Sequence, residues 1–269
     1  MKKTLCLALV IALASCSQQN EPWYLSVINK HAFDDEKQIE VKCALLDSGF
    51  NDGFQRYFQD DSILPEINLI EGETEHLNLH GTYLSMLIAS KEYGIDSNIS
   101  LLPIRILDYG GSTNSELVLK GLEAAKENEC KVVNMSFGST YYSEEIQNFI
   151  KENSDMIFVS SVGDMNQNEF FYPANYDGVY AISAVDKNNE LSAYSNTSSA
   201  KEPILAPGVD IPLPGRTGEI VNKTGSSFSS ALVSGVICAS LLRDNLNIDN
   251  LASNNLYTNG HLDCKKFLR

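Results

Sequence analysis

Short apolar runs recur along the chain and alternate with stretches of helical periodicity. Residues 41–46 are apolar apart from Lys42, as expected of a strand that is covered on both faces. Further strands are predicted at 99–107, 131–135, 156–161 and 179–185. Helices are predicted at 114–128, 143–152 and 227–242, and residues 23–33 form an amphipathic stretch ahead of the first strand.

Strands that alternate with helices predict an α/β fold, in which a mostly parallel sheet carries helices on both faces. The chain has 269 residues, which suits one sizeable domain. Ligands in such folds bind at the carboxyl ends of the strands. Polar residues near those ends are therefore the first candidates for chemistry.

Two such residues are Asp47 and His80. Asp47 directly follows the first strand in the run Leu-Leu-Asp-Ser-Gly, and Gly49 allows a sharp turn there. His80 opens an apolar helical stretch and is one of only four histidines. Taken alone, a strand-end Asp is most often a turn former, and a lone His at a helix start is usually structural or solvated. Gly81 favours a functional His80, because a small residue lets another backbone come close.

A run of serines that includes Ser227 opens the last long helix, directly after Gly225. The first turn of a helix has free N–H groups and the positive end of the helix dipole, and both stabilise a developing anion. The same position suits an ordinary N-cap serine, which stabilises a helix by about 1 kcal/mol. Local sequence alone therefore does not select Ser227 from its neighbours.

The three sites together are more specific than any one of them. Their chain order, Asp then His then Ser, is that of subtilisin rather than of chymotrypsin or the α/β-hydrolases. Asp47-Ser48-Gly49, His80-Gly81-Thr82 and Gly225–Gly235 resemble the Asp, His and Ser motifs of the subtilisin-like serine peptidases (subtilases, peptidase family S8). The resemblance runs from about Trp23 to the C-terminus. It implies a subtilisin-like three-layer α/β/α architecture, a polypeptide substrate, and Asp47, His80 and Ser227 as the catalytic triad.

The same resemblance implies where the substrate binds. Residues 132–138 are similar to the family segment that pairs with the substrate backbone as an added strand, which assigns substrate binding to Ser136, Phe137 and Gly138. Gly110 and Gly111 are likewise assigned to substrate binding. Phe171 is expected to narrow the floor of the pocket for the residue before the scissile bond. Glu169 is expected either to attract a basic side chain there or to be a solvated loop residue.

The sequence departs from the family at Asp164. Subtilases have an Ala-Gly-Asn segment here, with the Asn side chain facing the oxyanion, whereas this chain has Val-Gly-Asp. An ionised carboxylate cannot donate a hydrogen bond, and losing one such donor lowers turnover by roughly 10²–10³. Three interpretations stay open: a protonated Asp164 donates, the loop brings in Asn166, or the protein is a weakly active or inactive subtilase. The complete triad favours an active serine endopeptidase over a silent peptide-binding protein.

The N-terminus has the pattern of a targeting segment. Lys2 and Lys3 precede an apolar stretch at 4–13, which is too short for the ~20 residues of a membrane span. Leu13-Ala14-Ser15-Cys16 then resembles the lipobox of bacterial lipoproteins; the alternative is a plain secretory signal. The resemblance implies a signal peptide at 1–15, a lipidated Cys16, a short tether at 16–22 and a peptidase domain at 23–269. The protein is therefore expected to be lipid-anchored to the cell membrane or outer membrane, outside the cytoplasm.

Composition narrows the possible partners. The formal net charge of −15 argues against nucleic acid, which needs clustered Lys and Arg. No cofactor or metal is expected, and the protein is expected to be a monomer. The four remaining thiols after the targeting segment permit disulfides in an exported protein, although Cys43 and Cys238 fall in apolar elements and are expected to be core residues. These thiols are Cys43, Cys130, Cys238 and Cys264.

Overall fold

A seven-stranded sheet forms the centre of the molecule in the residues that the computed structural model describes, which are 21–33, 39–72, 77–243, 257–258 and 261–262. The strand order is β2-β3-β1-β4-β5-β6-β7, and every neighbouring pair is parallel. The strands are β1 (Lys42–Asp47), β2 (Ile67–Asn68), β3 (Ser100–Arg105), β4 (Val132–Met135), β5 (Ile157–Ser161), β6 (Val179–Val185) and β7 (Ile204–Pro207). The predicted signal peptide, Cys16 and Cys264 lie outside the described residues.

The strand order turns at β1, which pairs with β3 on one side and with β4 on the other. The chain leaves β1 toward one edge of the sheet and returns to fill the other side. The carboxyl end of β1 is therefore the topological switch point, where open α/β sheets bind their ligands. Asp47 is the last residue of β1 and lies at this point.

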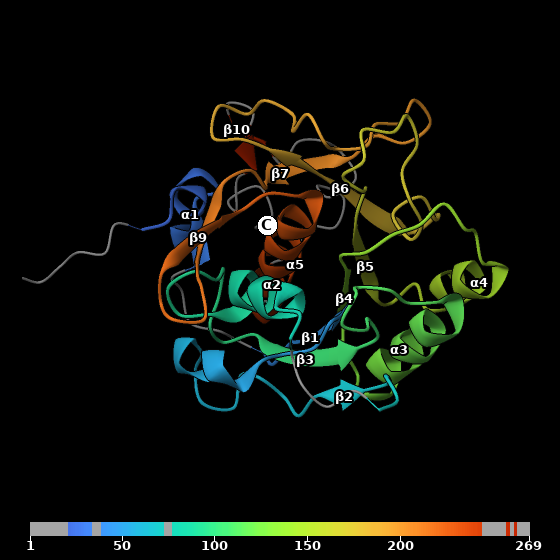
Figure 1. Ribbon diagram of the computed structural model, residues 1–269, viewed down its shortest axis with the longest axis horizontal. Coiled ribbons are helices and arrows are strands. Elements are labelled where there is room, and N and C mark those ends of the chain that lie inside the picture. The colour runs from blue at the N-terminus through green and yellow to red at the C-terminus, as the bar shows by residue number, and fades with distance from the viewer. Residues whose placement is uncertain (1–20, 34–38, 73–76, 244–256, 259–260, 263–269) are drawn as a thin grey trace, which may run out of the picture.

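Helices cover both faces of the sheet (Figure 1). Helices α2 (His80–Ala89) and α5 (Ser226–Leu242) share one apolar core, and α3 (Ser115–Glu127) and α4 (Glu144–Glu152) share the other. Helix α5 is apolar or small on all sides because it is buried almost throughout its length. A Cβ on Gly235 would come within 2.8 Å of the Ile95 side chain, so glycine allows this close packing.

The predicted three-layer α/β/α architecture is confirmed. The predicted strands and helices form within one or two residues of their expected ends, because buried apolar runs mark them clearly. The amphipathic N-terminal stretch divides into α1 (Trp23–Val27) and the short 3₁₀ helix Lys30–Phe33.

Other elements were not predicted from the sequence. They are β2, β7, the 3₁₀ helix Asp52–Tyr57, and the antiparallel pairs β8 (Ile211–Pro214) with β9 (Ile220–Lys223) and β10 (Tyr257–Thr258) with β11 (His261–Leu262).

Candidate active site

Asp47 and His80 meet at the carboxyl end of β1. Nδ1 of His80 lies 2.8 Å from Asp47 Oδ1 and 3.1 Å from Oδ2. The Asp47 side chain is 1% exposed and the His80 side chain 29%, so the carboxylate is enclosed while the imidazole reaches the surface. An ionised carboxylate can only accept, which places the proton on Nδ1 and leaves Nε2 free to accept one.

Glycine at position 81 makes this approach possible. A Cβ on Gly81 would lie 2.6 Å from the Gly49 carbonyl oxygen and 3.1 Å from Asp47 Oδ1. Helix α2 can therefore begin at His80, directly against the turn that follows β1. The backbone N–H of Gly81 also donates to the Ser48 hydroxyl at 3.0 Å, which ties the two motifs together.

The environment of His80 favours its protonated form. Burial is the largest influence and lowers the pKa of the imidazole. Attraction to the Asp47 carboxylate and the hydrogen bond with it act the other way and prevail, so the pKa of His80 is raised from its ordinary 6.5. An Asp that stabilises an imidazolium in this way suits a histidine that takes up a proton during a reaction.

Ser227 lies in the first turn of α5, and a buried polar network holds the backbone around it. Its hydroxyl donates to the Ser136 carbonyl at 3.2 Å, and the Ser227 carbonyl accepts from the hydroxyls of Ser136 and Ser230 at 3.2 and 2.9 Å. The Asn134 amide donates to Ser230 and Ser234 and accepts from Ser136. This network was not predicted from the sequence. Its signal was Asn134, a fully buried amide in the middle of an apolar strand.

The structure brings Ser227 to the same region as His80. Phe228, the next residue after Ser227, packs edge-on against the His80 ring, with 5.9 Å between ring centroids. His80 and Ser136, whose carbonyl accepts from Ser227, line one cavity. The three residues chosen from the sequence motifs therefore gather at the carboxyl edge of the sheet.

Asp164 also reaches this helix terminus, after the end of β5. Its two carboxylate oxygens each lie 2.9 Å from the backbone N of Ser226, and Oδ2 accepts from the Ser226 hydroxyl at 3.0 Å. Asp164 thus acts as the N-terminal cap of α5 from a distant part of the chain. Asn166 is exposed, with φ of 51° and its backbone N–H bonded to the Tyr194 carbonyl.

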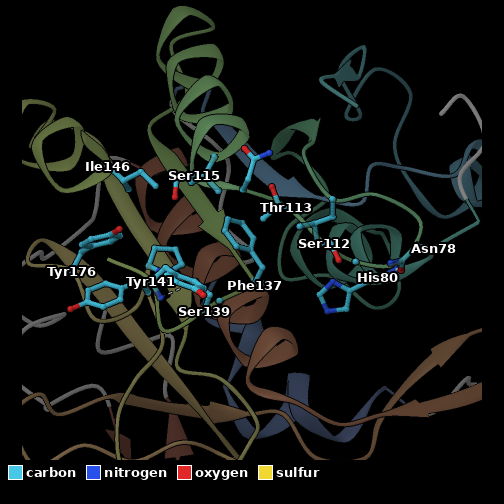
Figure 2. A pocket seen from close by; sticks show the side chains of 18 residues that line it. Asn78, His80, Ser112, Thr113, Ser115, Phe137, Ser139, Tyr141, Ile146 and Tyr176 are labelled. Atoms are coloured by element: carbon cyan, nitrogen blue, oxygen red, sulfur yellow. Dashed lines mark hydrogen bonds between the residues drawn. The ribbon is translucent and has the colours of Figure 1, made fainter. Parts of the chain in front are cut away.

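A cavity of about 860 Å³ runs away from His80 (Figure 2). Segments 111–115 and 136–139 form two of its sides, and Figure 2 shows Tyr141 and Tyr176 at the end opposite His80. Four of the five residues expected to bind substrate line this cavity. The fifth, Gly110, is not in the lining but directly precedes Gly111, which is. Further lining comes from Leu107, Val118, Ile146 and Tyr172.

Phe171 packs between the segments at 136–138 and 161–163. A Cβ on Gly138 or on Gly163 would lie 2.8 Å from Phe171 atoms, so both glycines give this ring its space. Phe171 is not among the residues that line the cavity, so its role in narrowing a side-chain pocket stays a prediction. Glu169 is exposed nearby.

Comparison with known proteins decides the family. The model of the subtilase family matches residues 39–255 of this chain. The chain belongs to the subtilase family.

Several named relatives agree with that assignment. Subtilisin DY of Bacillus licheniformis is 27% identical over 212 residues, covering 74% of this chain and 76% of the relative. Subtilisin Savinase of Lederbergia lenta is 27% identical over 278 aligned positions, covering 93% of this chain and 100% of the relative. The Minor extracellular protease Epr of Bacillus subtilis is 29% identical over 216 residues, covering 76% of this chain and 32% of the relative. This subtilase is a serine-type endopeptidase, as its motifs predicted.

Other sequence expectations concern thiols, metals and membranes. Cys43, Cys130 and Cys238 of the subtilase are free thiols, and all three are buried. The residues described here contain no cluster of three or more His, Cys, Asp or Glu side chains that could hold a metal ion. In the same part of the chain, every helix is too short or too polar to span a membrane.

Proposed function

We propose that this subtilase cleaves peptide bonds with Asp47, His80 and Ser227 as its catalytic triad. The observation that carries the proposal is the 2.8 Å contact of His80 with the buried Asp47, beside a serine in the first turn of α5. His80 Nε2 takes the proton of the Ser227 hydroxyl as Oγ attacks the substrate carbonyl. His80 then gives that proton to the leaving amine, and water hydrolyses the acyl-enzyme.

The oxyanion of this reaction would form at the N-terminus of α5. The backbone N–H of Ser227 supplies one donor there, aided by the helix dipole. The substrate is proposed to lie extended in the cavity, paired with the backbone of Ser136–Gly138 on one side and Gly110–Gly111 on the other.

A fluorophosphonate probe tests the triad, because it phosphonylates only an activated serine. We expect labelling of the wild type and of Ser199→Ala, an exposed serine used as a control, and none of Ser227→Ala. Absence of labelling between about pH 5 and 9 would contradict the proposal.

The capping carboxylate of Asp164 favours a second candidate function. A negative charge beside Ser226 opposes the developing oxyanion, so the chain would be a catalytically impaired subtilase that binds peptides without cleaving them. This function would be favoured if the wild type did not react with the fluorophosphonate but bound peptides in calorimetry. That binding should be lost when residues 136–138 are substituted so that a peptide can no longer pair with them.

We also infer a location and a class of substrate. Cys16 in the lipobox-like sequence is proposed to carry a lipid that anchors the protein outside the cytoplasm. Cys16→Ser should release the protein from membranes, and continued membrane association would contradict the anchor.

A compact membrane-tethered peptidase suits processing of exported proteins or peptides, such as a bacteriocin leader. A precursor peptide and an exporter encoded beside this gene would support that substrate. A precursor that the purified enzyme leaves intact would contradict it.

A further inference from the structure

Lys223 is a local positive charge close to the candidate active site of a strongly acidic protein. It is the last residue of β9, four positions before Ser227 in the chain. Its ammonium lies 4.6 Å above the centroid of the Tyr83 ring, a cation–π contact. Tyr83 follows His80 by three residues on α2, so the two side chains lie about one helical turn apart on the same side.

Lys223 lies outside the lining of the substrate cavity. The lining of that cavity includes His80 but neither Tyr83 nor Lys223. In Figure 1, α2 and α5 stand between β9 on the left and helices α3 and α4, which border the cavity, on the right. Under the proposed mechanism the acyl part of the substrate occupies the cavity, which places the leaving peptide outside it, and the β8–β9 hairpin lies beside α2 there through the contact of Lys223 with Tyr83.

The charge of Lys223 reaches the catalytic histidine. The positive ammonium repels a positively charged imidazolium, so it lowers the pKa of His80, although this effect is smaller than that of Asp47. Two other charges lie on the same hairpin. Arg216 donates to the Leu77 carbonyl at 3.0 Å, and the Glu219 carboxylate accepts from the backbone N–H and hydroxyl of Thr217. Within the described residues, Lys223 makes no ion pair.

We propose that Lys223 is a specificity-determining residue on the leaving-group side, where it selects substrates with Asp or Glu in the first two residues after the scissile bond. The ammonium is held over Tyr83 rather than by a carboxylate, so a carboxylate of the substrate can pair with it. The proposal rests on the triad of Asp47, His80 and Ser227.

Internally quenched peptides that differ only in having Glu, Gln or Lys at these two positions test the proposal. Partly exposed ion pairs are worth little, so we expect kcat/KM to favour Glu by about two- to five-fold at low salt and less at high salt. Lys223→Met should remove the preference, and Lys223→Glu should reverse it toward a Lys substrate. Lys187→Met, an exposed lysine in a β6–β7 turn, should keep it.

Acyl transfer gives a second measurement that uses the same side of the site. The acyl-enzyme formed from a chromogenic ester should be captured faster by glutamate amide than by glutamine amide in the wild type, and equally in Lys223→Met. Equal rates for Glu and Gln in the wild type, with normal cleavage of both, would overturn the role of Lys223 and leave the triad intact. Cleavage that survives in Ser227→Ala would overturn the triad itself.

Discussion

Asp164 accepts hydrogen bonds from both the backbone N–H and the hydroxyl of Ser226, the residue immediately before the candidate nucleophile. The carboxylate therefore stabilises the N-terminus of α5, because a negative charge there complements the helix dipole. Under the proposed mechanism, an oxyanion would develop at this same helix terminus. Helix stability and transition-state stabilisation thus make opposite demands on this residue.

Asp164→Asn separates these two demands. The Asn Oδ1 can still accept from Ser226, while its Nδ2 gains the ability to donate to the oxyanion. We expect kcat to rise by up to about 10²-fold, because a single oxyanion donor contributes about that much to turnover. We also expect a loss of about 0.3–1 kcal/mol of unfolding free energy, because the charge at the helix terminus is removed.

Steady-state kinetics and urea unfolding measure both effects. Asp164→Ala, which can neither accept nor donate, should lose more stability and gain less turnover than Asp164→Asn, because it removes the opposing charge without adding a donor. A fall in kcat for Asp164→Asn would show instead that this subtilase uses the carboxylate in its own mechanism.

The Asp47–His80 pair predicts where activity is lost in acid. Free enzyme needs a neutral His80 to accept the Ser227 proton, and the pKa of His80 is raised above 6.5. The acid limb of kcat/KM should therefore have its midpoint above pH 6.5. Asp47→Asn should lower kcat by roughly 10⁴ and move the limb to lower pH, because the attraction that raises the pKa is gone. If the acid limb has the same midpoint in this variant, Asp47 does not set the pKa of the group that controls activity in acid.

The sequence predicted the triad because each member lies in a short motif at the end of a buried element. Residues 41–46 and 227–242 are marked by apolar or small residues, so the ends of these elements could be placed from pattern alone. The choice of Ser227 among the neighbouring serines came from the resemblance to the subtilase motifs. The partner of Asp164 could not be found in this way. Ser226 is 62 residues away in the chain, and only the packing of β5 beside α5 brings the two together.

The β8–β9 hairpin shows why other parts escaped prediction. Its strands have only four residues each. β8 also contains Pro212 and Pro214, and within sheets proline is largely confined to edge strands, so the segment does not read as a strand from sequence. Without a predicted hairpin, Lys223 could not be placed near His80. The burial of a whole strand leaves an apolar run that can be seen in the sequence. A contact between two segments far apart in the chain leaves no such local pattern.

Asp96 and Arg243 form a buried ion pair that should matter for stability. Their side chains are only 6% and 4% exposed, and Arg243 Nη1 lies 2.7 Å from Asp96 Oδ2. Arg243 also donates to the carbonyls of Ala239 and Phe33, so it links the end of α5 to the N-terminal helical segment. Removing one partner of a buried pair leaves the other charge uncompensated.

We expect Asp96→Ala to lower the free energy of unfolding by about 3–5 kcal/mol in urea. Replacing both partners with apolar residues, as in Asp96→Leu with Arg243→Met, should cost much less because no charge is left behind. A double variant as unstable as Asp96→Ala would indicate that the pair itself, rather than the orphaned charge, provides the stability.

Lys201 should make the stability of the fold depend on pH. Its ammonium donates to the carbonyls of Ala174 and Tyr176 at 2.7 and 2.8 Å, and burial lowers its pKa to about 8 while Asp177 acts weakly against this. The pKa in the unfolded chain is about 10.4, so between these values the unfolded state binds more protons than the folded state. The free energy of unfolding should therefore rise with pH from about 8 to 10, by no more than about 3 kcal/mol, and the burial penalty should be felt in full below pH 8.

Urea unfolding at several pH values should show this slope in the wild type and in Lys187→Met, and a flatter one in Lys201→Met. The same slope in all three proteins would mean that Lys201 titrates alike in the folded and unfolded states.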